Sequence, residues 1–537
     1  MACITKQHIG DRTYLYESES FRDINGKPRN RKRAIGKIDP ATGKIIYKQA
    51  YLDRMRAAGT PVEIADTQTY ISQNQLEKTY AVMDSVKDYG VAYLLNAISE
   101  QIGLTKILKT VIPSYWQEVL TLAYYMVVSD KPVMYCSDWV STIETYDVGN
   151  MTSQRISELL AAFGADTRDS FYKAWCRHIT EKEYVALDIT SISSYSELIT
   201  ENEWGYNRDH DNLPQINLCM MLGEQSQLPI YQTVYNGSIK DVSTLKCTMA
   251  EFRSLIPESR IRIVMDKGFF SVKNINAMLD KDNGNDFLIS VPFTSSFACK
   301  QVEGARKSID QIENTVITSS TPIRGVHHLR AWSTSGEKIH THILYNPEKE
   351  MKEKNELYGY VTDLKKKADE NPTDPKLREE FDKYLLIRRS EKTASGFTIT
   401  IRDDVIQKQL EHTGWLVLIS NCVTEVQEAH DLYRTKDVVE KGFCRLKNSL
   451  ELGRLHVQRN DRMQNKLFVG FLALILMSWL HRRMTTHGLY KQMTFDKMMM
   501  ILSKIRVATI SGHKILRPLS KEQKLLLAQL GVTDPVG

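Results

Sequence analysis

Between residues 185 and 292 short apolar segments alternate with amphipathic spacers, and this pattern constrains the fold more than any other feature of the sequence. Five segments have the length and composition of buried strands: Val185–Asp188, Ile216–Leu222, Pro229–Tyr235, Ile261–Asp266 and Phe287–Pro292. The spacers near 241–254 and 271–280 have helical periodicity. Strands and helices in this order predict an α/β layer architecture.

Residues 293–430 do not continue the alternation. They contain predicted strands at His340–Tyr345, Phe397–Ile401 and Trp415–Ile419, around a charged helical stretch from 348 to 388. We interpret this region as a β-rich insertion in the α/β domain. Helices follow it, and one of them contains the apolar run Leu467–Leu480, whose 14 residues are fewer than the roughly 20 needed to cross a bilayer. This run is interpreted as a buried helix.

The N-terminal part is basic and precedes a helical region. Residues 11–50 predict short strands with a turn at Asn25–Gly26, and seven Lys or Arg residues against one acid lie between Arg22 and Lys37. Residues 76–180 predict helices, of which Thr152–Leu160 and Arg168–Trp175 could form a helix-turn-helix or an ordinary structural pair. A second basic run spans 441–466. Two distant basic runs suit a protein that grips a polyanion, although such runs are also common on solvated surfaces.

Overall composition is less informative than these local patterns. The 71 basic and 65 acidic residues leave a formal charge of only +6, which says little about partners. Eight cysteines occur without a C-x-x-C pair, which favours reduced thiols in a cytosolic protein and argues against a zinc site. The N-terminus has no basic-then-apolar signal sequence, so we expect no secretion.

Two aspartates share one setting, because Asp188 and Asp266 each end a short apolar strand. If these strands are neighbours, two carboxylates come close together, an arrangement that needs a cation. Mg²⁺ prefers oxygen ligands of this kind. Taken alone, an aspartate at a strand end is more often a turn or cap residue. Gly268, two residues further on, leaves room for a backbone or a phosphate.

The segment Asp431–Leu450 gives the strongest functional signal. On one continuous helix, Tyr433, Lys436, Glu440 and Lys447 would fall within an arc of roughly 60°. An adjacent apolar stripe, made of Val439, Phe443, Leu446 and Leu450, could dock on a sheet. The polar face then offers a hydroxyl, a carboxylate and two ammonium groups, which suits a metal held beside a phosphodiester. The alternative is an ordinary amphipathic helix with a surface pair between Lys436 and Glu440.

The spacing from Tyr433 to Lys447 resembles the YREK signature of bacterial insertion-sequence DDE transposases, with Lys436 in place of the arginine. That change keeps a cation but loses the bidentate fork of an arginine. The resemblance extends to four further segments: Leu187–Ser191, Asn236–Asp241, Met265–Phe269 and Gly414–Asn421. It therefore covers most of residues 180–480, and the N-terminal 150 residues match less specifically.

The resemblance implies a ribonuclease-H-like α/β core interrupted by the β-rich insertion, with a small N-terminal β module and helical N- and C-terminal regions. The implied domains are a basic DNA-contacting module (1–75), a helical DNA-binding region (76–180), the first part of the core (181–292), the insertion (293–430), the second part of the core with the Glu helix (431–480) and a C-terminal helical region (481–537). By resemblance the chain is a bacterial, cytoplasmic and nucleoid-associated protein.

The activity implied by the resemblance is DNA transposition. Asp188, Asp266 and Glu440 would bind two Mg²⁺ ions, which Mn²⁺ could replace. The enzyme would cut double-stranded DNA at the terminal inverted repeats and join the 3′ ends to target DNA, as a homodimer on DNA and without a membrane. Many members cut the second strand through a DNA hairpin; the sequence leaves this route open here.

DNA contacts are also implied by the resemblance. Tyr433, Lys436 and Lys447 would contact phosphates of the cleaved end, with Arg445 and Arg454 as weaker candidates. Trp332 is expected to be exposed and to stack on an unpaired base, whereas Trp415 lies in a predicted strand and is the weaker candidate. In the N-terminal module, the candidates are Arg29, Arg31, Lys32 and Arg33.

Two other functions are also compatible with the sequence. One is a ribonuclease-H-like nuclease or resolvase that cuts without joining. The other is a domesticated transposase that only binds specific DNA, although the retention of all three carboxylates argues against it.

Overall fold

The structure is a computed structural model. It describes the chain except residues 1–2, 11, 40–44, 60–82, 180–183, 210, 257–260, 281–284, 320, 333–335, 391–395, 511–512 and 536–537. The chain divides into two compact units, Met1–Met83 and Asp84–Gly537, and each is described by itself. The domain borders expected near residues 75 and 180 lie outside the described residues.

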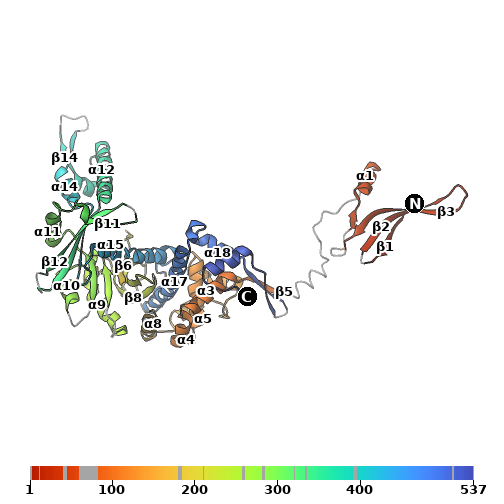
Figure 1. Cartoon of the computed structure of the whole chain (residues 1–537), viewed down its shortest axis with the longest axis horizontal. Coiled ribbons are helices and arrows are strands. Elements are labelled where there is room, and N and C mark those ends of the chain that lie inside the picture. Colours follow the sequence, from red (N-terminus) through yellow and green to blue (C-terminus); the bar gives the residue numbers. More distant parts are fainter. Residues whose placement is uncertain are drawn as a thin grey trace. The chain divides into compact units, whose positions relative to one another are not determined.

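In its described residues, the first unit contains a four-stranded antiparallel sheet in the order β1-β2-β3-β4 and one helix (Figure 1). Its elements are β1 Cys3–Ile9, β2 Arg12–Arg22, β3 Pro28–Ile38, β4 Ile45–Tyr47 and α1 Gln49–Ala57. The predicted strands and the turn at Asn25–Gly26 are confirmed, and Gly26 adopts the φ of +72° that such a turn requires. Leu15, Ile35 and Tyr51 form a small core.

A nine-stranded sheet dominates the second unit, in the order β11-β12-β13-β16-β10-β9-β6-β7-β8. Its strands are β6 Val185–Ser193, β7 Gln215–Gly223, β8 Pro229–Asn236, β9 Arg262–Met265, β10 Asp286–Ser290, β11 Thr315–Val316, β12 Ile323–Ala331, β13 Lys338–Tyr345 and β16 Trp415–Ser420. All five strands predicted between 185 and 292 are present and adjacent. Strands β6, β7 and β8 run antiparallel, and β9 runs parallel to both β6 and β10. This arrangement is a ribonuclease-H-like core, as expected.

The region expected as an insertion is divided between this sheet and a smaller cluster. Strand β16 pairs with β10, so β16, β13, β12 and β11 extend the core sheet rather than form a sheet of their own. The edge of β10 would otherwise present unpaired backbone groups. The hairpin of β14 Leu385–Arg389 and β15 Phe397–Ile401 packs with α12 Pro347–Glu370, α13 Arg378–Tyr384 and α14 Asp403–Leu410 around a separate apolar core (upper left in Figure 1).

Helices cover the sheet and lead away from it. The helices near it are α9 Asp241–Leu255, α10 Val272–Leu279, α11 Ser296–Ala305, α15 Val426–Arg434, α16 Asp437–Cys444 and α17 Asn460–Thr486. Helix α17 contains the apolar run 467–480 and is buried, as predicted. It is long and apolar enough to cross a membrane, but 89% of its most apolar 18-residue window lies inside the fold.

The helical region before the core packs on strand β8 and on α17. Its helices are α3 Gly90–Gln101, α4 Leu104–Val111, α5 Trp116–Val128, α6 Cys136–Thr142, α7 Ser153–Leu159 and α8 Ala165–His178. The second helix of the predicted helix-turn-helix buries Phe171 and Trp175, and the Trp175 indole donates to the Pro229 carbonyl at 2.9 Å. That face of α8 therefore packs in the core, which agrees with the interpretation of the two helices as an ordinary structural pair.

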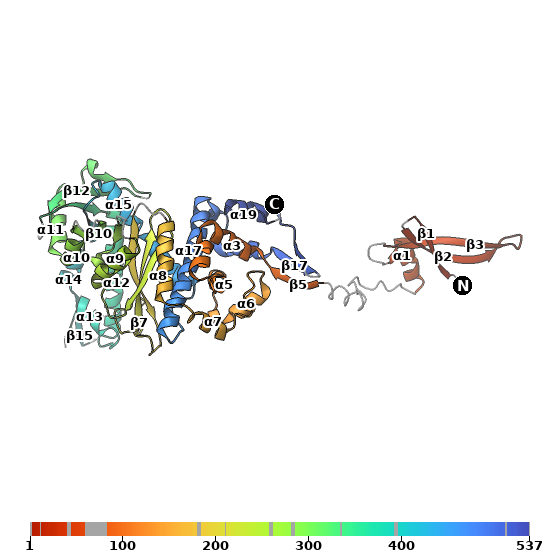
Figure 2. The same ribbon diagram turned by 90° about the horizontal axis from the view of Figure 1, so that it is seen from below.

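The C-terminal region was expected to be only helical, and the structure corrects this. Besides α18 Phe495–Ser503 and α19 Lys521–Gln529 it contains β17 Arg506–Ile510 and β18 His513–Leu516. These strands form a three-stranded sheet with β5 Met83–Asp88, so the two ends of the second unit lie side by side (Figure 2). All three strands are short, and β5 lies at the opposite end of the sequence from β17, so local patterns do not reveal their pairing.

Candidate active site

Strand register brings Asp188 and Asp266 together. Leu187 on β6 pairs with Met265 on the parallel strand β9. The next residue along the chain is the aspartate in both cases, within β6 for Asp188 and directly after β9 for Asp266, so the two carboxylates lie side by side. The expectation that these two strands are neighbours is confirmed.

Asp188 lacks an ion pair with any described residue. Its Oδ1 accepts a hydrogen bond from the Ile189 backbone at 2.8 Å. Burial raises the pKa of this carboxyl to about 6, against the lowering effects of that hydrogen bond and of the charges on Lys436 and Arg208. A cation bound next to Asp188 would stabilise the ionised form of this carboxylate.

Asp266 is held by three side chains. The Tyr433 hydroxyl donates to its Oδ1 at 2.9 Å and Ser290 Oγ donates to the same oxygen at 3.2 Å. The Lys436 ammonium lies 3.3 Å from its Oδ2. Burial raises the pKa of this carboxyl, but Lys436 and the hydrogen bonds to it outweigh burial, so the pKa is lower than usual. Asp266 therefore stays ionised.

The helix predicted over 431–450 is not continuous, which corrects the sequence analysis. Helix α15 ends at Arg434, the Thr435 hydroxyl donates back to the Leu432 carbonyl at 2.6 Å, and α16 begins at Asp437. A π-helical turn, η5 Arg445–Ser449, follows α16. The apolar stripe nevertheless docks as expected, because α16 contacts β6 and β7 and Val439, Phe443, Leu446 and Leu450 are buried.

Lys436, at the break between α15 and α16, joins Asp266 to Glu440. Its ammonium lies 2.9 Å from Glu440 Oε1 as well as 3.3 Å from Asp266. Burial lowers the pKa of Lys436, but Asp266, Tyr433 and Glu440 together raise it above its usual value. Lys436 therefore stays charged, and the Glu440 side chain remains 56% exposed. Two carboxylates far apart in the sequence thus meet at one ammonium group, and Asp188 emerges beside one of them, Asp266.

The donor set fits a hard divalent cation by its chemistry. All three candidate ligands are carboxylates, and Asp188 is a half-buried carboxylate without a counterion among the described residues. Within the same residues, however, no group of three Asp, Glu, His or Cys side chains is already placed to hold a metal. Lys436 itself supplies the positive charge between Asp266 and Glu440 in this arrangement.

The other basic residues proposed to contact DNA in this segment have partners in two different parts of the fold. Lys447 lies 2.5 Å from Asp209, and Arg454 lies 3.4 Å from Asp211. Both therefore contact the loop between β6 and β7. Arg445 points elsewhere: its guanidinium lies 3.5 Å from Ser478 on α17, and burial lowers its pKa. The structure thus does not bring Arg445 to the carboxylates.

The expected exposure of Trp332 is wrong. The side chain is 3% exposed, its indole donates to Asn276 Oδ1 at 2.7 Å, and its ring makes edge contacts with Phe270 and Phe297. It packs between helices and strands in the core and offers no free face to a base. Trp415 is also buried, as expected for a residue on strand β16.

Sequence reasoning missed three exposed aromatic residues in the loop that follows β6. Tyr195, Trp204 and Tyr206, in the β6–β7 loop, are 63%, 64% and 77% exposed. The backbone between the last two is fixed, because a Cβ on Gly205 would lie 2.0 Å from the Gly237 carbonyl oxygen. Arg454 lies over the ring of Tyr195, 5.4 Å from its centroid. The sequence Trp204-Gly205-Tyr206 lies in a segment without helix or strand periodicity, and this could have identified the loop as one with exposed aromatic side chains.

Arg208 and Asp241 were also missed. They form an ion pair with each other, and a Cβ on Gly268 would lie 3.0 Å from Asp241 Oδ2. Gly268 therefore makes room for the Asp241 carboxylate. Asp241 is the last residue of the turn Asn236–Asp241 that the sequence analysis singled out, but nothing in that motif indicated its partner.

The N-terminal candidates all lie on β3. Arg29, Arg31, Lys32 and Arg33 are exposed. Arg29 forms an ion pair with Asp23 at 3.0 Å, and Arg31 lies over the ring of Phe21. This strand therefore presents a basic surface to solvent in the first unit.

A ribonuclease-H-like core that gathers an aspartate of its first strand, an aspartate after its fourth strand and a glutamate of a following helix is typical of DDE nucleases and transposases. Residues 180–476, more than half of the chain, match the family model of the transposase DDE domain. The chain therefore belongs to this family of transposases. A comparison with curated proteins found no significant match.

Among solved structures, the chain is similar to piggyBac transposase, determined by cryo-EM as a synaptic complex with hairpin DNA. The identity is 11%, and the match covers 76% of this chain and 70% of that one. The TM-score of 0.32 is too low to carry any argument about this chain.

Proposed function

We propose that this protein is a DNA transposase of the YREK group of bacterial insertion sequences, which cuts at the terminal inverted repeats of its element and joins the freed 3′ ends to target DNA. The proposal is supported by two observations on a ribonuclease-H-like core: strand register places Asp188 beside Asp266, and Lys436 forms ion pairs with both Asp266 and Glu440. Membership of the transposase DDE family supports the same activity.

In this proposal Asp188, Asp266 and Glu440 hold two Mg²⁺ or Mn²⁺ ions. When bound, the ions would activate the attacking oxygen and stabilise the leaving one in each phosphodiester exchange. Tyr433 and Ser290 keep the Asp266 carboxylate oriented through hydrogen bonds to the same oxygen. The exposed position of Glu440 leaves its carboxylate free to reorient when a substrate enters.

Basic and aromatic side chains around the carboxylates would bind the DNA end. Lys436 and Lys447 would exchange their present carboxylate partners for phosphates, since a side-chain ammonium can pair with either. The aromatic group of Tyr195, Trp204 and Tyr206 takes over the stacking role that the sequence analysis assigned to Trp332. Base stacking on an exposed ring contributes about 1 to 3 kcal/mol per base. A homodimer on DNA, which would let two ends be cut in concert, is part of the same proposal.

The test is a cleavage and strand-transfer assay with duplexes that carry the inverted repeats flanking the coding region. We expect cut ends and joined products with Mg²⁺ or Mn²⁺, and neither with Ca²⁺ or chelator. Glu440→Gln should abolish both products and leave DNA binding within about twofold, whereas the matched variant Glu451→Gln, on the segment after η5, should retain activity.

Each alternative function gives a different result. Cleavage without joined product would indicate a nuclease or resolvase. Specific binding without cleavage by the wild-type protein would indicate a domesticated DNA-binding protein.

A further inference from the structure

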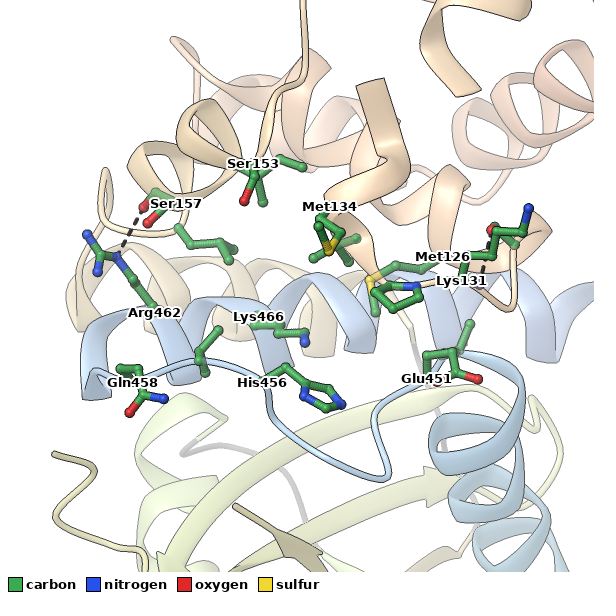
Figure 3. Close-up of a pocket in the computed structure, with 17 residues that line it drawn as sticks. Met126, Lys131, Met134, Ser153, Ser157, Glu451, His456, Gln458, Arg462 and Lys466 are labelled. Atoms are coloured by element: carbon green, nitrogen blue, oxygen red, sulfur yellow. Dashed lines mark hydrogen bonds between the residues drawn. The ribbon is translucent and has the colours of Figure 1, made fainter. Parts of the chain in front are cut away.

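A cavity of about 330 Å³ lies apart from the three carboxylates, and none of the active-site residues lines it. Its walls come from α5, η1 Val133–Tyr135, α7, the segment 450–458 and the first turns of α17 (Figure 3). The volume is at the lower end of the range, roughly 300 to 1,000 Å³, of small-molecule sites in proteins. The cavity can therefore hold a compact organic molecule.

One wall of the cavity carries a buried cation. The Lys466 side chain is 5% exposed, and its Nζ donates to the Leu455 carbonyl at 2.7 Å. No carboxylate of the described residues forms an ion pair with it. An ammonium group has three protons to donate, so this lysine retains unused donors in a place where burial penalises its charge. Burial lowers its pKa to about 8, against a smaller raising effect of the charge on Glu451.

The surroundings of Lys466 combine positive charge with apolar surface. Figure 3 shows the Lys466 amine and the His456 ring on the same side of the space, with Met134 and Ser153 across from them. The apolar lining includes Met126, Val133, Ile156, Leu160 and Val457. Arg462 also lines the cavity, where its Nε donates to the Ser157 carbonyl at 3.3 Å. Glu451 is the one acidic side chain among the lining residues.

Two residues of the segment 450–458, which forms one wall of the cavity, have an uncommon backbone conformation. Glu451 and His456 have φ values of +54° and +48°, which non-glycine residues seldom adopt. Residues held in this way cluster at ligand-binding sites, where the surrounding structure maintains the strain. Both side chains line the cavity.

We propose that this cavity binds a small organic anion, with its acidic head group on Lys466 and its apolar body against the methionine and aliphatic side chains. The head group would provide the counterion that Lys466 lacks, and the uncharged part would fill the apolar volume. The proposal does not depend on the proposed transposase activity, because it concerns other residues and can be tested without DNA.

The direct test is calorimetry of the full-length protein with three ligands that share one ring system: 1-naphthoate, 1-naphthyl phosphate and the neutral 1-naphthalenemethanol. We expect one site for at least one of the two anions and at least tenfold weaker binding of the alcohol. The preferred anion identifies the head group as a carboxylate or a phosphate. Equal binding of all three ligands, or no binding, would overturn the proposal.

Substitutions then assign the binding to Lys466. Lys466→Met, which keeps an apolar stem, should weaken the anion at least tenfold, and Lys466→Arg should retain most of the affinity. Lys497→Met, at an exposed lysine of α18, is the matched control and should bind like the wild type. Unchanged affinity in Lys466→Met would refute the assignment.

A second measurement needs no variant and so does not depend on correct folding of a mutant. The wild-type protein is treated with acetic anhydride at pH 8 with and without the preferred anion, and each lysine is quantified by mass spectrometry. We expect selective protection of Lys466 by the ligand, with Lys497 unaffected. Equal modification of Lys466 in both samples would count against the proposal.

Discussion

The Lys436 ammonium group lies 3.3 Å from the Asp266 carboxylate and occupies the corner where the candidate metal ligands meet. The same group contacts Glu440 at 2.9 Å. In the absence of a metal the protein thus carries its own counterion for two of its three carboxylates. In the proposed function, divalent cations would compete with this lysine for Asp266 and Glu440.

Replacement of Lys436 by Met should therefore strengthen metal binding. The variant leaves two carboxylates without a neighbouring cation, and we expect its affinity for Mn²⁺ to rise at least about tenfold. Titration calorimetry measures this directly, with Lys447→Met as the control because that ammonium pairs with Asp209. The interpretation of Lys436 as a competitor fails if both variants bind Mn²⁺ like the wild type.

Asp188 should make the metal-free protein less stable as the pH rises. Its folded-state pKa of about 6 is above the ordinary value of 3.8, so the folded state holds the proton more tightly than the unfolded chain does. Stability contributed by this group is complete below about pH 4 and is lost as the pH rises through 6. Asp188→Asn should be more stable than the wild type at pH 7 by about 1–3 kcal/mol, with no difference near pH 4. Urea unfolding in the presence of chelator at both pH values tests this, and a constant difference would contradict it.

Tyr433→Phe isolates one hydrogen bond to Asp266. The ring is retained, while the 2.9 Å hydrogen bond to the half-buried Asp266 carboxylate is removed. We expect a loss of about 1.5–3 kcal/mol in the free energy of unfolding, as is typical for a hydrogen bond to a charged group. Tyr358→Phe, at an exposed tyrosine whose hydroxyl has no partner among the described residues, is the control, and the two variants are compared by urea unfolding. Equal stability of Tyr433→Phe and the wild type would show that Ser290 and Lys436 hold Asp266 without the tyrosine hydroxyl.

Two tryptophan variants should differ in what they lose: Trp332→Ala should lose stability, and Trp204→Ala should lose affinity for DNA. Trp332→Ala removes a ring that is 3% exposed and should destabilise the protein by about 3–5 kcal/mol. Trp204→Ala removes a ring that is 64% exposed and should change stability by less than about 0.5 kcal/mol. Only Trp204→Ala should weaken binding to DNA with unpaired terminal bases more than binding to blunt duplexes. Fluorescence anisotropy with both DNAs checks this, and an equal loss for both would exclude stacking.

The basic strand β3 should contribute to DNA binding through phosphates. In the double variant Arg31→Gln and Lys32→Gln, the slope of log K against log salt should become less steep by about 0.9 for each phosphate that the protein no longer neutralises. Nitrocellulose filter binding at several salt concentrations measures the slope. Lys37→Gln, near the end of the same strand, is the control. An unchanged slope in the double variant would place these side chains away from the phosphates.

The core was predictable from the sequence because its strands are continuous apolar runs. The runs that form β6, β7 and β10 are buried on both faces, so their pattern does not depend on distant partners. The carboxylates were found for a related reason: Asp188 and Asp266 interrupt or end such runs. Their adjacency depends on register, and here the register matched the family resemblance.

Other features depend on interactions that local patterns do not encode. The break at Thr435 and the π-turn after Cys444 interrupt the predicted continuous helix. Tyr433 and Lys436 contact Asp266, whereas Lys447 pairs with Asp209. Trp332 follows a strand and precedes Ser-Thr-Ser-Gly, which suggests an exposed turn, yet Phe270 and Phe297 cover it from distant segments. Burial of that kind is decided by tertiary packing.

The cluster of α12, α13, α14 and the β14–β15 hairpin leaves and re-enters the sheet at one place. Asn346, just before the cluster, donates its backbone N–H to the Gly414 carbonyl at 2.8 Å, and the neighbouring residues Tyr345 and Trp415 are cross-strand partners. A segment closed at its base in this way can grow, shrink or be exchanged without altering how Asp266 and Glu440 approach each other. Relatives could thus acquire new DNA contacts here while inheriting the same chemistry.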